Sequence, residues 1–339
     1  MSPLKTPGFR DVADQAGVSV TTVERVLNER GSVSPQTRMK VLEAAERLQL
    51  RRVLPSPDYG NLRIEAILPK NPTPYWAKLS AGLRNAAKLL PRGIALYRTF
   101  VPENDPPAMI RAIAASKMRR SALIVAAEVN DEIAGTLASV AGQGEIVVLV
   151  SSKLPELPVQ TFSGVDNVAA GRTAASLINF ARSGRESKVL VLQANSTLQS
   201  HRDRIEGFTT TIGQRFSIDI VMTHEMPGAS WRIVNEMLAQ DRVPDAIYET
   251  GDSGDEIATL LRGMENRPIW IGHERNAAHD QLMREGLLDF VLDQDPDRQA
   301  RWAMRHILSQ LGVAGSKFST VKRPELRLFC AANLQDFDS

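Results

Sequence analysis

The chain has 339 residues, more than one ordinary hydrophobic core accommodates, so two or three domains are expected. Its formal net charge of +2 is too small to indicate a nucleic-acid-binding protein on its own. The single cysteine, Cys330, excludes an intramolecular disulfide. The N-terminus has no signal-peptide core, and no apolar run of the sequence approaches the roughly 20 residues that span a membrane, so we expect a cytoplasmic protein.

The first predicted elements are three short helices. Apolar residues at helical spacing predict one helix over residues 10–16 and a second over 20–28. Gly17 ends the first, because glycine adopts a left-handed cap without steric cost. Ser19 suits the N-cap of the second, and a Ser-Pro pair opens a third helix over 35–48. The segment therefore indicates a helix-turn-helix with a supporting helix behind it.

The exposed face of the second helix carries residues that suit contacts with a DNA duplex. Thr21 and Thr22 can reach phosphates or base edges, and Arg25 can make a bidentate contact to guanine or phosphate. The candidate DNA-binding residues are Ser19, Val20, Thr21, Thr22, Glu24, Arg25, Asn28 and Arg30. From these residues alone, a plain helical packing unit without a nucleic-acid role remains the alternative.

The segment resembles the DNA-binding headpiece of the lac-repressor/gal-repressor family. The positions shared with the family pattern are Asp11, Val12, Ala13, Ala16, Gly17, Val18, Ser19, Thr22, Val23, Arg25, Val26, Leu27, Asn28, Ser34, Thr37, Arg38, Val41, Ala44 or Ala45, and Leu48. Gly8 departs from the usual Thr or Ser cap, and Glu24 replaces a small residue that faces phosphate. A carboxylate near phosphates is repulsive, so we expect Glu24 to pair with Arg25 or Arg30, or to accept from a cytosine amine.

A predicted linker over residues 51–61 follows the predicted DNA-binding domain of residues 1–50. In the family, this place holds a hinge helix that inserts apolar side chains into the minor groove. Here prolines interrupt the stretch, which disfavours such a helix. Val53 and Leu54 remain the candidates for an apolar wedge.

From residue 62 onward, strand-like apolar runs alternate with helical patterns. The runs cover 64–68, 94–97, 123–126, 146–150, 189–192, 218–221, 246–248, 269–271 and 290–292. Such a β-α repeat predicts doubly wound parallel sheets, and these runs exceed one typical sheet of about five or six strands. The predicted fold class is therefore α/β: an all-α headpiece followed by two doubly wound lobes. Ligands of such sheets bind at the carboxyl ends of the strands.

The alternating part resembles the type I periplasmic-sugar-binding-protein core of lac-repressor-like regulators, over essentially all of residues 62–334. The resemblance implies a first lobe of about 62–163 plus 294–322, and a second of about 164–293 plus 323–334. It also implies a sugar or polyol effector between the lobes.

Four candidate residues of the predicted cleft come from two segments that resemble family motifs. Asn71 opens a segment like the family's Asn-Pro-Phe-Phe, whose aromatic residues stack on a sugar ring. Trp76 or Tyr75 is the expected stacking residue, and the alternative is a Trp that anchors its helix in the core. Asp166, in a turn like the family's "DN..GG", either accepts hydroxyl hydrogen bonds or caps the following helix.

The remaining candidate ligand residues follow later strands. Arg204 lies in a segment like the family's "R..GF", and its planar donors suit vicinal hydroxyls or a carboxylate, with a surface ion pair as the alternative. Asp252 follows a glycine that replaces the family's ligand-binding Asn, so either the pocket is larger or Asp252 makes that contact. Glu274 replaces the usual Asp, and His273 beside it either titrates near neutrality or packs. Gln294 is the hydroxyl contact expected at the crossover between lobes.

The sequence contains no nucleophile elbow, metal-ligand spacing or Walker-type loop, so we expect no enzyme and no cofactor. The predicted function is that of a homodimeric, sequence-specific transcriptional regulator, a repressor, controlled by a sugar or polyol. Its expected partners are a pseudo-palindromic double-stranded DNA operator, the effector and a second copy, without a membrane. The alternatives are a periplasmic-type sugar receptor without a DNA role and a carbohydrate-active enzyme.

Overall fold

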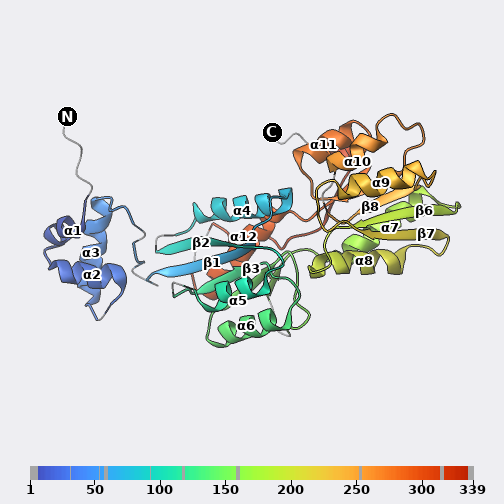
Figure 1. Cartoon of the computed structure of the whole chain (residues 1–339). Coiled ribbons are helices and arrows are strands. Elements are labelled where there is room, and N and C mark those ends of the chain that lie inside the picture. The colour runs from blue at the N-terminus through green and yellow to red at the C-terminus, as the bar shows by residue number, and fades with distance from the viewer. Residues whose placement is uncertain are drawn as a thin grey trace.

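The structure is a computed structural model in which a small helical headpiece precedes two α/β lobes (Figure 1). It describes residues 7–30, 32–52, 54–56, 60–91, 93–116, 119–157, 161–251, 254–313 and 317–334. Within these ranges, no helix combines the length and the apolar character needed to cross a membrane.

Three helices form the headpiece: α1 Phe9–Ala16, α2 Val20–Asn28 and α3 Pro35–Arg47. Local capping chemistry sets where α2 and α3 begin. The Ser19 hydroxyl accepts from the Thr22 N–H at 3.1 Å, and the Ser34 hydroxyl accepts from the Thr37 N–H at 3.2 Å. All three helices contribute to a miniature apolar core, which includes Val12, Val23, Leu27, Val41 and Leu42.

The described part of the linker folds back onto the headpiece and contains no helix. Leu54 is only 8% exposed and packs into the headpiece core, so it is not free to act as a minor-groove wedge. This corrects that expectation, while Val53 lies outside the described residues. Ser56 and Gly60 pair in an antiparallel bridge, with the Ser56 N–H 2.8 Å from the Gly60 carbonyl oxygen.

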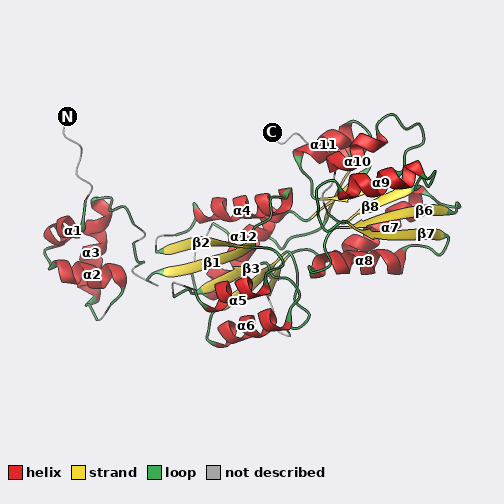
Figure 2. Cartoon of the chain, viewed as in Figure 1, coloured by secondary structure: helices red, strands yellow, loops and turns green. Residues whose placement is uncertain are grey.

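The first lobe contains a parallel sheet in the order β2-β1-β3-β4-β5. Its strands are β1 Leu62–Pro69, β2 Ile94–Val101, β3 Ala122–Val125, β4 Ile146–Val150 and β5 Thr161–Ser163. Two helices from distant parts of the chain pack together over one face: α4 Pro74–Ala87 and α12 Pro296–Gln310. The opposite face is covered by α5 Pro106–Ala114 and α6 Asp131–Gly142 (Figure 2).

The second lobe contains a sheet in the order β11-β10-β9-β8-β6-β7, parallel except for β11. Its strands are β6 Ser187–Gln193, β7 Phe216–Met222, β8 Ala246–Glu249, β9 Ile269–His273, β10 Phe290–Asp293 and β11 Arg327–Phe329. One face is covered by α7 Asn167–Ala181 and α8 Gln199–Thr211. The other carries α9 Ala229–Ala239, α10 Gly254–Leu261 and α11 Ala277–Arg284, and a short 3-10 helix, Ala331–Asn333, follows β11.

The loops that follow the strands of both sheets meet between the lobes. Residues directly after β4, β8, β9 and β10 line one common hollow there, together with Thr73 in the loop after β1. Parallel strands place their carboxyl ends at one edge of a sheet, so two facing lobes bring both edges together. The predicted fold class is confirmed, and every predicted apolar run coincides with a strand, while β5 and β11 were not predicted.

Candidate functional site

The exposed face of α2 is the candidate nucleic-acid interface. Val20, Thr21, Arg25 and Asn28 are exposed on it, while the apolar side of the helix packs against α1 and α3. The hydroxyls of Ser19 and Thr22 lie 2.9 Å apart, so the two side chains are occupied partly by the helix cap. The arrangement leaves short side chains and one arginine at the surface, where they can approach a duplex.

Glu24 and Arg30 are also exposed near this face. Among the described residues, Glu24 forms no ion pair, so the expected pairing with Arg25 or Arg30 is not found. Contact of Glu24 with a cytosine amine stays a prediction.

A polar hollow lies between the two lobes and is the candidate ligand site. About 420 Å³ of it is not filled by protein atoms, including space open to solvent. We call it the interlobe hollow, and the residues that line it are Thr73, Tyr75, Trp76, Ser151, Leu198, Ser200, His201, Arg204, Glu225, Thr250, Gly251, Glu274 and Gln294.

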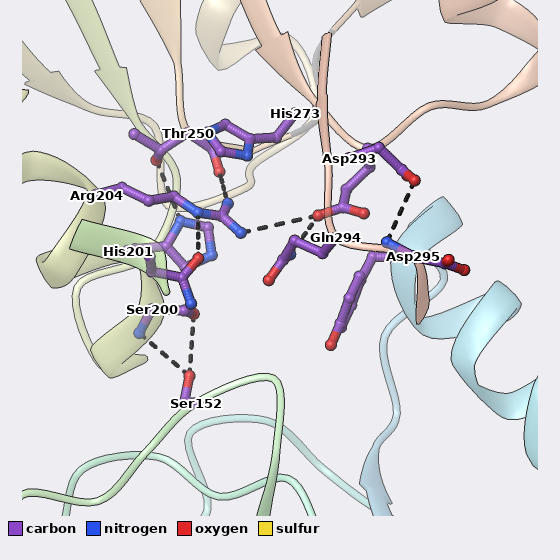
Figure 3. A network of polar contacts seen from close by, with 12 residues as sticks. Ser152, Ser200, His201, Arg204, Thr250, His273, Asp293, Gln294 and Asp295 are labelled. Carbon is purple, nitrogen blue, oxygen red and sulfur yellow. Dashed lines mark hydrogen bonds and ion pairs between the residues drawn. The ribbon is translucent and has the colours of Figure 1, made fainter. Parts of the chain in front are cut away.

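Arg204 projects from α8 into the interlobe hollow and is 3% exposed (Figure 3). Its Nε donates to Asn167 Oδ1 at 3.0 Å, and its Nη1 donates to the backbone oxygen of Thr250. Its Nη2 lies 3.8 Å from Glu274 Oε1. The buried guanidinium is therefore fixed by the second lobe and faces a carboxylate, which differs from the alternative of a surface ion pair.

Glu274 and Gln294 lie opposite Arg204, in the turns after β9 and β10. Gln294 Nε2 donates to Glu274 Oε1. Burial, and then the negative charge of Asp293, raise the pKa of Glu274 to about 7, although Arg204 opposes the shift. The site thus holds a carboxyl group whose charge changes near neutral pH.

His201 and Ser200 extend the polar wall along α8. His201 Nδ1 lies 3.1 Å from Thr250 Oγ1, and burial, followed by the charge of Arg204, lowers the pKa of His201 well below its usual value. The imidazole is therefore neutral at pH 7. Ser152, after β4 in the first lobe, donates to Ser200 Oγ at 3.0 Å and joins the two lobes at the edge of the hollow (Figure 3).

Tyr75 and Trp76 supply the aromatic wall. Their rings meet edge to face, with centroids 4.8 Å apart. The Tyr75 hydroxyl donates to Gln299 Oε1 at 2.9 Å, and burial raises the pKa of Tyr75. Trp76 packs in the core of the first lobe and also lines the hollow, so both predicted roles are open to it.

Three of the candidate ligand residues, Asn71, Asp166 and His273, do not line the interlobe hollow. Asn71 donates to Glu103 at 2.9 Å and to Glu225 at 3.1 Å, so its amide bridges the lobes. Asp166 is exposed and caps α7 by accepting from the Ala169 N–H at 2.9 Å. The structure thus takes the capping alternative for Asp166.

His273 is fully buried behind the hollow, with Nε2 3.0 Å from the Tyr248 hydroxyl. Burial lowers the pKa of His273 well below its usual value, so it packs as a neutral side chain and does not titrate near neutrality. Asp252, the remaining candidate, lies outside the described residues.

Several lining residues were missed from the sequence, namely Ser151, Ser200, His201, Glu225 and Thr250. One signal was available, because His201 stands three residues before Arg204 and therefore shares its helix face. Ser200 also lies on α8, in its first turn. Ser151, Glu225 and Thr250 lie in loops or directly after a strand, where spacing alone does not fix the direction of a side chain.

Comparison with known proteins agrees with this architecture. The model of the bacterial regulatory proteins of the lacI family matches residues 9–51, and that of the periplasmic binding protein domain matches residues 64–315. The HTH-type transcriptional regulator DegA of Bacillus subtilis is 26% identical over 58% of this chain and 58% of its own length. The HTH-type transcriptional repressor PurR of Photobacterium profundum is 26% identical over 61% of this chain and 60% of its own.

The chain thus spans about three fifths of the length of these two curated relatives. Among solved structures, the glucose-galactose binding protein GanP of Geobacillus stearothermophilus superposes with a TM-score of 0.68 at 17% identity, over 81% of this chain and 99% of that one. That likeness shows the fold of the two lobes. With both parts matched, the chain belongs to the lacI family of bacterial regulatory proteins, with a periplasmic binding protein domain as its core.

Proposed function

We propose that the protein is a sequence-specific DNA-binding transcriptional regulator, acting as a repressor, whose operator affinity is controlled by a sugar or polyol in the interlobe hollow. One observation carries this proposal. A helix with an exposed polar face and a buried polar hollow belong to one chain, and a folded-back linker connects them. A receptor without a DNA role would not need the first feature.

The proposed regulator works as a homodimer on a pseudo-palindromic operator. One α2 helix offers few contacts, and two copies related by two-fold symmetry would double them. In this proposal, residues 1–50 read DNA, 51–61 link, and 62–334 form the effector-binding lobes. A cytoplasmic location follows from access to chromosomal DNA.

Effector control requires that the sugar or polyol bind one arrangement of the lobes better than another. The hollow supports this requirement because both lobes line it, with Tyr75 and Trp76 from the first and Arg204 from the second. The relatives are transcriptional regulators, so the proposal includes no catalytic activity.

The test is selection of binding sites from random double-stranded DNA with the purified chain, followed by gel retardation. We expect a pseudo-palindromic sequence, bound with two copies of the chain. Arg25→Ala should weaken specific binding by about 1–3 kcal/mol, because a bidentate contact is lost. Arg47→Ala is the matched control, since this arginine is exposed at the end of α3 and, within the described ranges, its ion pair is with Glu43 at 3.7 Å.

Retardation is repeated with each compound of a sugar and polyol panel. Failure to enrich any sequence at low salt would refute the DNA-binding proposal. Specific binding that no panel compound alters would refute effector control by this class of ligand.

A further inference from the structure

Two buried hydrogen-bond acceptors in the interlobe hollow have no partner. Glu274 Oε2 and Gln294 Oε1 are both shielded from solvent, and neither accepts a hydrogen bond among the described residues. The two residues are 94% and 97% buried and line the hollow. Leaving a buried acceptor unsatisfied costs about 1–3 kcal/mol, so the site is built for a ligand that donates hydrogen bonds.

The strongest donor in the hollow is already largely engaged by the protein. Two of the three guanidinium nitrogens of Arg204 donate to Asn167 and to the Thr250 backbone. The third faces Glu274 Oε1 at 3.8 Å. The unsatisfied groups of the site therefore need hydrogen-bond donors on the ligand more than acceptors.

The charge around the hollow also favours a ligand that donates hydrogen bonds. Glu225 and Glu274 line it together with one cation, Arg204, while His201 is neutral because burial lowers its pKa. A neighbouring hollow, which shares Trp76, is also lined by acidic side chains, among them Glu103 and Glu128. Burial and the negative charges of Glu103 and Asp105 raise the pKa of Glu128.

Trp76 adds an aromatic surface at the junction of these two hollows. An aromatic ring face attracts a cation, and an ammonium carries three donors and no acceptor. A neutral hydroxyl, in contrast, carries one donor and two acceptor lone pairs.

We propose that the effector is an ammonium-bearing polyol, such as an amino sugar, whose cationic nitrogen pairs with Glu274 Oε2 and whose hydroxyl donates to Gln294 Oε1. This inference rests on the proposed function and narrows its ligand class. The ammonium keeps Glu274 ionised in a buried site, and the remaining hydroxyls meet Ser151 and Arg204.

The test compares three matched series with the purified full-length chain by titration calorimetry at pH 7. Each series contains an amino sugar, its parent sugar and its N-acetyl derivative, for glucosamine, galactosamine and mannosamine. At least one amino sugar should bind about tenfold or more tightly than both of its counterparts, since a hydrogen bond to a charged group is stronger than a neutral one.

Glu274→Gln keeps the shape of the side chain and removes its charge, so the preference for the amino sugar should fall to about twofold or less. Glu225→Gln provides a second charge-neutral variant, for which we expect a smaller loss of the preference for the amino sugar. Glu156→Gln, an exposed position in the first lobe, is the matched control and should keep the full preference.

The inference is overturned if no amino sugar binds at millimolar concentration, or if the parent or N-acetyl compound binds at least as well in every series. It is also overturned if folded Glu274→Gln retains the preference. Operator retardation on the same samples separates the two proposals. A neutral sugar that releases DNA would leave the proposed function intact, whereas an amino sugar that binds without changing operator affinity would refute effector control alone.

Discussion

At the scale of single residues, the side chain of Arg204 both joins elements of the second lobe and lines the candidate ligand site. Its guanidinium is held by Asn167 from α7 and by the backbone after β8, and these contacts join three elements of the second lobe. The same group faces Glu274. A buried ion pair is stable only when its remaining donors and acceptors are satisfied. In this pair, Glu274 Oε2 has no hydrogen-bond partner among the described residues.

The raised pKa of Glu274 leads to a pH-dependent stability. Its pKa rises from 4.5 unfolded to about 7 folded, so the folded state binds more protons between these values. Stability contributed by this group is therefore lost as the pH rises from about 4.5 to 7. Glu274→Gln removes the cost of ionisation. The difference in free energy of unfolding between this variant and the wild type should therefore shift in favour of the variant by on the order of 2 kcal/mol as the pH rises from 5 to 8.

Urea denaturation of the ligand-free chain at several pH values measures this difference. Glu43→Gln serves as the control, because its carboxylate is exposed on α3 and lies outside the interlobe hollow. A difference between Glu274→Gln and the wild type that does not change with pH would contradict the assignment.

At the scale of elements, α7 and α8 lie unusually close because each presents a glycine to the other. A Cβ on Gly171 would lie 2.0 Å from the Arg204 carbonyl oxygen, and one on Gly207 would lie 2.0 Å from the Val168 carbonyl oxygen. Both obstacles are backbone atoms, which cannot rotate away. The close approach of the two helices therefore sets the position from which Arg204 reaches the interlobe hollow.

We expect Gly207→Ala to push the helices apart and to lower the free energy of unfolding by about 1–3 kcal/mol, as overpacking does. Gly135→Ala is the matched control, since this exposed glycine lies in α6 with no atom within 4 Å of a new Cβ. There the change should stabilise the helix by roughly 0.5–1 kcal/mol. Equal effects in urea denaturation of the two variants would contradict the close-packing interpretation.

The sequence predicted elements better than it predicted side-chain directions. Long apolar runs fixed the main strands, whereas β5 and β11 have three residues each and show no readable pattern. Arg204, Glu274 and Gln294 reach the hollow as expected. Asp166 and His273 do not, because a cap and a buried hydroxyl partner turn them away, and such tertiary contacts leave no mark in local spacing.

At the scale of the whole molecule, the headpiece is tied to the first lobe by a small polar contact at the end of α2. Glu29 has a left-handed backbone, with φ of 54°. Its carboxylate accepts from Arg38 at 2.9 Å and from the Asn61 N–H, directly before β1, at 2.8 Å. Arg38 also donates to the Ser56 carbonyl oxygen at 3.2 Å. The end of α2, α3 and the last linker residue before β1 thus share one carboxylate.

Removal of that carboxylate should release the linker. In Glu29→Ala, Arg38 and the Asn61 N–H lose their shared acceptor, while the headpiece core is untouched because Glu29 is exposed. Arg51 and Arg52 lie in the linker, and Arg52 is held by the Leu27 carbonyl oxygen at 2.9 Å. Trypsin should therefore cleave after these arginines about fivefold faster, since losing roughly 1 kcal/mol raises the open population by that factor.

The control is Glu43→Ala, which removes a carboxylate from an exposed pair in the same headpiece and should leave the cleavage rate unchanged. Mass spectrometry identifies the cleavage site, so general unfolding, which would expose arginines throughout the lobes, is distinguished from local release. Equal linker cleavage in Glu29→Ala and the wild type would show that the contact does not hold the headpiece. In that case, coupling between the hollow and DNA would have to pass through another part of the linker.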